Sequence, residues 1–144
     1  MGRREIIRLF RQHCRQKIHP FPARRAKLCA PNGLGVYVIR DAANRVVHVG
    51  RIPRAKGGIH QRLCDHLSGR SSFAYYYLNG DSSQLREAYS FQYLEVPDSR
   101  ERAILEAFAT GWLCPAHLGL GAANSDEADV DSTPDSGSNQ PIPG

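Results

Sequence analysis

The chain has 144 residues, a net charge of +5 and 41% hydrophobic residues, so it has room for one modest domain. No apolar run is long enough to cross a membrane, and no apolar segment follows the basic N-terminus, which argues against an integral membrane protein and a secretory signal. The four cysteines form no C-x-x-C pair and no common zinc spacing, which indicates reduced thiols in an intracellular protein, cytoplasmic or nucleoid-associated.

Residues 1–30 form a basic segment with nine Lys and Arg residues against the single acid Glu5, a net charge of +8. They contain no Ser or Thr, which argues against a transit peptide but leaves organellar targeting open. Helical spacing predicts a helix that ends before Pro20. The apolar stripe of this helix can pack on the core while its basic face binds phosphates. The apolar stripe consists of Ile6, Ile7, Phe10, Cys14 and Ile18.

A β-hairpin is predicted next. The runs GVYVIR at 35–40 and RVVHVG at 45–50 are rich in β-branched residues, and DAAN lies between them. With a two-residue loop at Ala43-Asn44, Tyr37 and His48 fall on the same face of the hairpin. A slip of one residue would place them on opposite faces.

A basic loop at 51–57 leads to a predicted helix at 58–67. Arg62 and His66 are four residues apart and share one face of this helix. Its neighbouring face, directed to the core, carries Ile59, Leu63 and Leu67.

The rest of the folded region is predicted to contain one strand and two helices. Residues 73–80 are a strand or an irregular aromatic segment, and residues 82–88 are a short helix. Residues 89–96 alternate well enough for a third strand. A helix over 99–110 follows, with Glu106 at the edge of its apolar stripe. That stripe consists of Leu105, Phe108, Ala109 and Trp112.

This order predicts a small three-layer α/β/α sandwich around a short, mainly antiparallel three-stranded sheet within residues 31–121. Residues 122–144 carry five acids and no base, and they are poor in aromatic residues. Such a segment buries too little apolar surface to fold, so we expect a disordered acidic tail. The tail is solvated or folds back on the basic head.

Four motifs in order resemble the GIY-YIG nucleases. Gly35-Val36-Tyr37 and His48-Val49-Gly50 resemble the two signature tripeptides. Downstream, Ile59-x-x-Arg62-Leu63-x-x-His66 resembles the arginine-bearing helix of the family, and Leu105-Glu106 followed by Pro115 resembles its metal-binding helix. The resemblance spans roughly residues 33–118.

The resemblance implies a Mg²⁺-dependent (or Mn²⁺-dependent) endonuclease that cuts DNA and needs no small-molecule cofactor. By this resemblance Glu106 is the protein ligand of the metal, Arg62 holds the scissile phosphate, and Tyr37 is the general base or proton relay. A tyrosine is a poor base at neutral pH unless its pKa is depressed. A strand-core tyrosine, an exposed helix arginine and a surface glutamate are the simpler interpretations of these three residues.

Two positions depart from the family pattern. His48 stands where the family usually has tyrosine, and a histidine titrating near neutrality can accept a proton directly. His117 follows Pro115-Ala116 where an asparagine is usual, and it is a candidate hydrogen-bond donor to substrate. Arg51 keeps a positive charge beside Gly50 and is a candidate phosphate contact. His66 either donates to phosphate or supports packing.

Three hypotheses remain. The first is an active DNA nuclease, which needs a homodimer or two visits to cut both strands and a partner or its own basic residues for targeting. The second is a catalytically inactive nucleic-acid-binding protein with the same fold. The third is an interaction module that uses the aromatic run at 73–77 to stack on bases or meet a partner.

Overall fold

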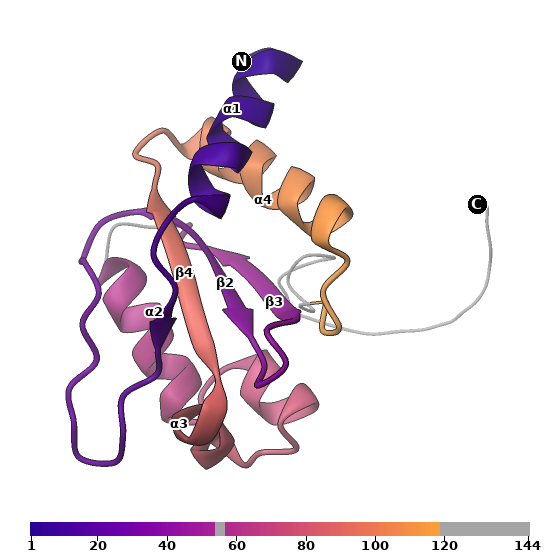
Figure 1. Cartoon of the computed structure of the whole chain (residues 1–144). Coiled ribbons are helices and arrows are strands. Elements are labelled where there is room, and N and C mark those ends of the chain that lie inside the picture. Colours follow the sequence, from indigo (N-terminus) through magenta and orange to yellow (C-terminus); the bar gives the residue numbers. More distant parts are fainter. Residues whose placement is uncertain (54–56, 119–144) are drawn as a thin grey trace.

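The structure is a computed structural model that describes residues 1–53 and 57–118. In this part the chain forms a four-stranded antiparallel sheet with helices on both faces (Figure 1). The predicted acidic tail at 122–144 and part of the predicted loop at 51–57 lie outside the described residues. The elements are α1 (Arg3–Cys14), β1 (His19–Pro20), β2 (Gly35–Arg40), β3 (Val46–Arg51), α2 (Gly58–Leu67), the π-helical turn η1 (Phe73–Tyr77), the 3-10 turn η2 (Ser82–Gln84), α3 (Leu85–Ala88), β4 (Ser90–Glu95) and α4 (Ser99–Leu113).

The strand order is β1-β4-β2-β3, so β2 lies between two neighbours and β3 lies at an edge. The prediction of three strands was incomplete, because β1 pairs with β4 through His19 and Phe91 and adds a fourth. A two-residue strand with a proline has no alternating pattern to reveal it, and proline is tolerated there because β1 is an edge strand. The His19 ring stacks on Phe91 and Tyr93, with centroids 5.3 and 5.5 Å apart.

The hairpin has the predicted register but a different loop. Tyr37 pairs with Gly50 and Ile39 with His48, so Tyr37 and His48 do share a face. Asp41 donates its backbone N–H to the Arg45 carbonyl at 2.9 Å, which closes a three-residue loop. Asn44 adopts φ 66° in this loop, and the register shifts after Ile39. A turn followed by a left-handed residue and a bulge is a common hairpin closure, and asparagine tolerates that conformation well.

Two hydrophobic cores lie on opposite faces of the sheet. We call them the α2/η1 face and the α1/α4 face after the helical elements that cover them (Figure 1). The α2/η1 face buries Tyr37, Phe73 and Phe91 under α2 and the segment that follows it. The α1/α4 face buries Val36, Val38 and residues of both helices. The chain therefore has the three layers expected from the sequence.

The helix ends follow local signals. The Asp98 carboxylate accepts the backbone N–H of Glu101 at 2.9 Å and caps α4. Helix α2 ends at Leu67, with Ser68 as its C-cap and Gly69 at φ 82°. Helix α1 buries Ile6, Phe10 and His13, whereas Cys14 and Ile18 of the predicted stripe are exposed because the helix stops at Cys14.

The aromatic run is helical and not a strand. Leu78 donates its backbone N–H to the Phe73 carbonyl at 3.3 Å, the five-residue step of a π-helical turn. This turn buries Phe73 and Ala74 and leaves Tyr75 and Tyr76 exposed. Within the described residues no helix is both long and apolar enough to span a bilayer.

Candidate active site

Tyr37 and Gly50 face each other across the β2–β3 hairpin, and the tyrosine ring lies directly over the glycine. A Cβ added at Gly50 would lie 2.8 Å from Cε1 of Tyr37, and closer still to the end of the ring. Any side chain larger than hydrogen would therefore displace the ring. The glycine of the second tripeptide thus has a physical reason: it makes room for the tyrosine of the first.

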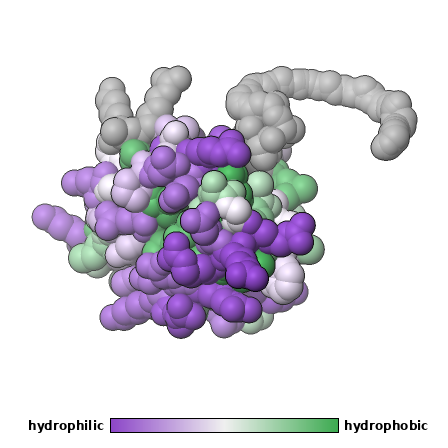
Figure 2. Space-filling view, turned by 90° about the horizontal axis from the view of Figure 1, so that it is seen from above, coloured by the Kyte–Doolittle hydropathy of each residue, from purple (hydrophilic) through white to green (hydrophobic). Residues whose placement is uncertain are grey.

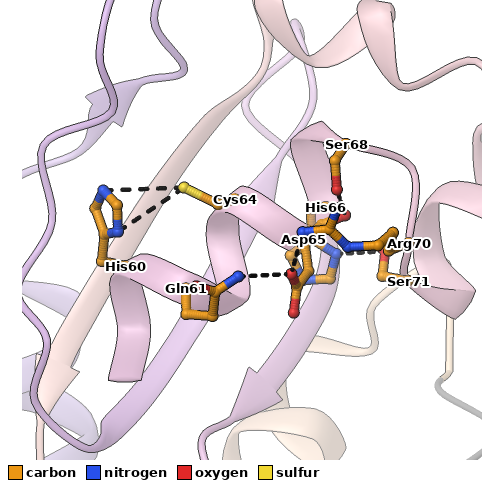
Figure 3. Close-up of polar contacts among 8 residues, drawn as sticks. All are labelled: His60, Gln61, Cys64, Asp65, His66, Ser68, Arg70 and Ser71. Carbon is orange, nitrogen blue, oxygen red and sulfur yellow. Dashed lines mark hydrogen bonds and ion pairs between the residues drawn. The ribbon is translucent and has the colours of Figure 1, made fainter. Parts of the chain in front are cut away.

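The Tyr37 hydroxyl is held by a histidine from α2. It lies 2.7 Å from Nε2 of His66, whose Nδ1 lies 2.6 Å from Oγ of Ser71. Figure 3 shows His66 and Ser71 at the end of α2. All three side chains are buried, so Tyr37, His66 and Ser71 form a continuous hydrogen-bonded chain away from solvent. Both ring nitrogens of His66 are used inside the protein, so this structure places His66 against Tyr37 and not toward a phosphate.

His48 lies beside the same hydroxyl at a longer distance. Its Nε2 is 3.5 Å from the Tyr37 oxygen, and its side chain is buried. Burial, together with the nearby His117 and Arg62, lowers the pKa of His48 to about 3. The expectation that His48 titrates near neutrality is therefore wrong, because the charged imidazolium would lose its hydration there without gaining a carboxylate partner.

Arg62 projects from α2 next to Tyr37. Burial raises the pKa of Tyr37, and the positive charge of Arg62 partly offsets this rise. In return, attraction to Tyr37 raises the pKa of Arg62, so the guanidinium stays charged. Tyr37 is therefore a neutral phenol at pH 7 with a cation beside it that would stabilise a phenolate.

Glu106 and Arg51 form an ion pair between α4 and the end of β3. Nε of Arg51 lies 3.3 Å from Oε1 of Glu106, and the glutamate side chain is 24% exposed. Partial burial raises the pKa of Glu106, while the charge of Arg51 lowers it. A carboxylate that has lost part of its hydration gains from any nearby cation.

The two groups of residues adjoin. The negative charge of Glu106 contributes to the raised pKa of Tyr37, so the carboxylate lies within electrostatic range of the phenol. Tyr37, Arg51, Arg62 and Glu106 come from β2, β3, α2 and α4, which are widely separated in sequence. Gly50 and Arg51 are consecutive on the edge strand β3, so the Arg51–Glu106 pair lies next to the position that Tyr37 covers, and three of the four side chains carry full charges.

His117 also lies beside His48. Its backbone N–H donates to the Val47 carbonyl at 2.9 Å, which ties the segment after α4 to the edge strand. Its ring centroid is 5.4 Å from that of His48 and 5.6 Å from that of Phe73. Nε2 of His117 is buried and has no hydrogen-bond partner among the described residues. The structure thus places His117 beside the signature histidine, with one ring nitrogen unused.

Two residues of this site were missed from the sequence. Ser71 binds His66, and the Phe73 ring stacks on His48 with centroids 5.0 Å apart. Both follow α2 in a segment whose course depends on how the chain returns to the sheet. The hydrophobic run at 73–77 gave a signal for Phe73 as a core residue, whereas a serine after a helix end is too common to indicate a site.

The other polar groups of α2 form local pairs. Gln61 and Arg70 both bind Asp65, at 2.9 and 3.1 Å, and Cys64 lies 3.8 Å from His60 (Figure 3). In the part of the chain that the structure describes, no three His, Cys, Asp or Glu side chains are grouped so as to hold a metal ion. A cation bound at Glu106 would therefore take its other ligands from phosphate and water.

The outer face of α1 carries the basic stripe predicted from the sequence. Arg4, Arg8, Arg11 and Arg15 line a shallow hollow together with Ile7. Seen from the side on which α1 lies, the surface is largely hydrophilic (Figure 2). The helix therefore docks its apolar stripe and leaves its arginines available.

No protein-family model matches the chain, and no curated protein matches it.

Proposed function

We propose that this protein is a Mg²⁺- or Mn²⁺-dependent endonuclease of the GIY-YIG type that hydrolyses phosphodiester bonds in DNA. The observation that carries the proposal is the meeting of Tyr37, Arg62 and the Arg51–Glu106 pair at the sheet edge beside Gly50. Hydrolysis of a phosphodiester needs a positioned phosphate, a path for the proton of the attacking water and stabilisation of negative charge. Each of these needs has a residue in this arrangement.

Arg62 is suited to bind the scissile phosphate. Its guanidinium is planar, remains charged and can donate two parallel hydrogen bonds to phosphate oxygens. It is half-buried beside Tyr37, so a phosphate bound to it would lie next to the phenol. Arg51, which is 38% exposed, supplies a second positive charge at the open end of β3.

Tyr37 acts as a relay and not as a preformed phenolate. Its oxygen accepts the proton of the attacking water as its own proton passes to Nε2 of His66, 2.7 Å away. Burial lowers the pKa of His66 well below its ordinary value, so the imidazolium holds this proton only during the reaction. The transfer requires the neutral His66 tautomer with its proton on Nδ1, which donates to Oγ of Ser71. His48 lies beyond hydrogen-bond range for a strong bond and lines the relay, where its ring limits the position of the phenol.

Glu106 fits the role of metal ligand. It is a partly buried carboxylate whose raised pKa reflects lost hydration, and the cation now beside it is Arg51. Mg²⁺ accepts one or two carboxylates and keeps water or phosphate as its other ligands, so one glutamate suffices. When bound, the ion would stabilise negative charge on the phosphate and the leaving oxygen. Arg51 would then turn from Glu106 to the phosphate.

A catalytically inactive nucleic-acid-binding protein is the second candidate. The observation in its favour is the complete burial of Tyr37, whose hydroxyl is bound to His66 and not directed to solvent. Against it stands Glu106, because a carboxylate beside a bound polyanion is unfavourable unless a cation lies between them.

The test compares wild type with Glu106→Gln on linear, nicked and branched DNA, with and without Mg²⁺. Glu101→Gln is the matched control, since it changes a carboxylate on the same helix that has no ion pair in the described residues. We expect wild type and Glu101→Gln to cut only with the metal, and Glu106→Gln to bind DNA without cutting. DNA binding with no metal-dependent cutting by wild type would select the inactive binder. Cutting that survives Glu106→Gln would overturn the metal assignment.

A further inference from the structure

Two large aromatic side chains are exposed side by side on the π-helical turn η1. Tyr75 is 65% exposed and Tyr76 is 55% exposed, and their ring centroids lie 4.7 Å apart at an interplanar angle of 86°. The sheet does not need them, because Phe73 and Ala74 of the same turn fill the core. The relay and the metal site described above do not use them either.

The turn that carries these tyrosines is anchored to the candidate active site. Phe73 is fully buried, stacks on His48 at 5.0 Å and meets His66 edge-on at 5.6 Å. Tyr77 stacks on the other side of Phe73 at 5.3 Å. Tyr75 is two residues from Phe73, so their Cα atoms are at most about 7 Å apart. The exposed pair is therefore carried by a short turn whose core residue directly contacts His48 and His66.

The charges of this segment favour a polyanion. Between Asp65 and Asp81 the sequence contains one charged residue, Arg70, and no acid. The Arg70 side chain is 65% exposed and is held by Asp65 at 3.1 Å. A strand bound at Arg62 and running over η1 would pass one carboxylate, Asp65, whose charge is offset by its ion pair with Arg70.

The size of the patch argues against a protein partner. On this segment the exposed large apolar side chains are Tyr75 and Tyr76 alone, among the residues that the structure describes. Two rings cover far less than the roughly 800 Å² per partner that a stable protein interface buries. Two aromatic faces are, however, enough to stack one or two bases, and a base can stack only where it has no paired neighbour on that face.

We infer that Tyr75 and Tyr76 form a stacking platform for unpaired bases next to the scissile phosphate. The preferred substrate is therefore DNA with a single-stranded segment, such as a flap, a branch or a gap, and not an uninterrupted duplex. The position of the scissile phosphate rests on the proposed nuclease function, whereas the stacking contact itself does not.

The test measures equilibrium binding without metal, so that no cutting occurs. Labelled single-stranded, flapped and duplex DNA of one sequence are titrated with wild type, Tyr75→Ala/Tyr76→Ala and Tyr75→Phe/Tyr76→Phe. Trp112→Ala is the control for loss of an exposed aromatic elsewhere, since Trp112 is 69% exposed at the far end of α4. We expect the alanine pair to weaken single-stranded and flap binding at least about tenfold and duplex binding by less than about twofold. The phenylalanine pair and Trp112→Ala should bind like wild type.

Equal losses on duplex and single strands, or no loss on any, would overturn the inference. A single-stranded RNA arm shows whether the platform also accepts ribose, since bases of either polymer can stack. The two proposals fail separately. If wild type cuts DNA with Mg²⁺ and the alanine pair keeps both its binding and its cutting of flaps, the platform is wrong and the nuclease stands. If wild type cuts nothing and the alanine pair still loses single-strand binding, the nuclease is wrong and the platform stands.

Discussion

The two faces of the sheet bury different chemistry. The α1/α4 face is closed mainly by aliphatic and aromatic side chains, with His13, Gln92 and Arg102 as its buried polar residues among those described. The α2/η1 face buries a tyrosine, two histidines and a serine in hydrogen-bonded contact, with a third histidine beside them. One sheet therefore has a face that resembles an ordinary core and a face whose core is titratable.

The difference indicates that the titratable groups around Tyr37 are concentrated on the α2/η1 face, whereas Glu106 reaches the candidate site from α4 on the other face. A buried polar group costs free energy unless it is well hydrogen-bonded, and a histidine kept neutral by burial costs more as the pH falls. Several buried histidines around one phenol are less favourable for stability than aliphatic side chains would be. Groups with shifted pKa values are frequent at functional sites. Matched substitutions on the two faces should then have different consequences, and three such pairs test this.

The largest expected effect comes from the two core phenylalanines. Phe10→Ala and Phe73→Ala should each lower the free energy of unfolding by about 3–5 kcal/mol, because both rings are buried and contact other rings. Urea unfolding measures this loss. Phe73→Ala should also lower the cutting rate of the protein that remains folded, because its ring positions His48 and His66, whereas Phe10→Ala should not. Phe73→Leu, a milder change, covers the case in which the alanine variant fails to fold. An equal effect of both phenylalanines on cutting would break the comparison.

The sequence predicted what local signals determine. The hairpin register that places Tyr37 and His48 on one face and the helix at 58–67 both depend on neighbouring residues, and both are present. Meetings between distant segments were not predictable in the same way. Ser71 against His66 and β1 against β4 depend on where the chain returns after a helix or an arm, and no periodicity encodes that.

Trp112 is a second residue whose surroundings the sequence did not predict. Helical spacing placed it in the apolar stripe of α4, yet it is 69% exposed. It contacts Phe108 and Phe10, with ring centroids 6.0 and 6.3 Å apart, and most of its surface faces solvent. Spacing predicts which residues share a helix face but not how far the neighbouring element extends over it. The nuclease role of Arg62 and Glu106 stays a prediction from resemblance and geometry.

A second pair compares two arginines. Arg102 is buried in α4 and donates from Nη1 to the carbonyls of Val96 and Pro97, at 3.0 and 2.7 Å. Arg62 is half-buried beside Tyr37. Arg62→Gln should reduce the cutting rate by roughly 10²–10³-fold, as expected for loss of a group that stabilises transition-state charge, with little change in stability. Arg102→Gln should lower stability by about 1–3 kcal/mol and leave the cutting rate of the folded protein unchanged. Cutting rates at saturating substrate together with thermal unfolding separate the two outcomes, and a reversed assignment would contradict the proposed site.

The smallest effect, and the most direct comparison of the two faces, concerns His13 and His48. Burial lowers the pKa of His13 to about 4 and that of His48 to about 3, from an ordinary value of 6.5. The unfolded chain therefore binds these protons near pH 6.5, and the folded chain binds them only near pH 4 or 3. Above about pH 6.5 these two histidines do not reduce the free energy of unfolding. As the pH falls from there toward the pKa of each histidine in the folded protein, the free energy of unfolding decreases. Each contributes up to about 1.4 kcal/mol per pH unit to that loss.

His13→Leu and His48→Leu should each reduce the pH dependence of the free energy of unfolding around pH 5, by up to about 1.4 kcal/mol per pH unit. Urea titrations at successive pH values measure this change. His66 and His117, whose pKa values are also lowered by burial, retain part of the pH dependence of stability in both variants.

At pH 7 only His48→Leu should slow cutting, since His13 lies on the opposite face from Tyr37. An unchanged slope in His13→Leu would mean that this histidine is charged in the folded protein. Normal cutting by His48→Leu would assign the signature position to packing, and the relay would then consist of Tyr37 and His66 without it.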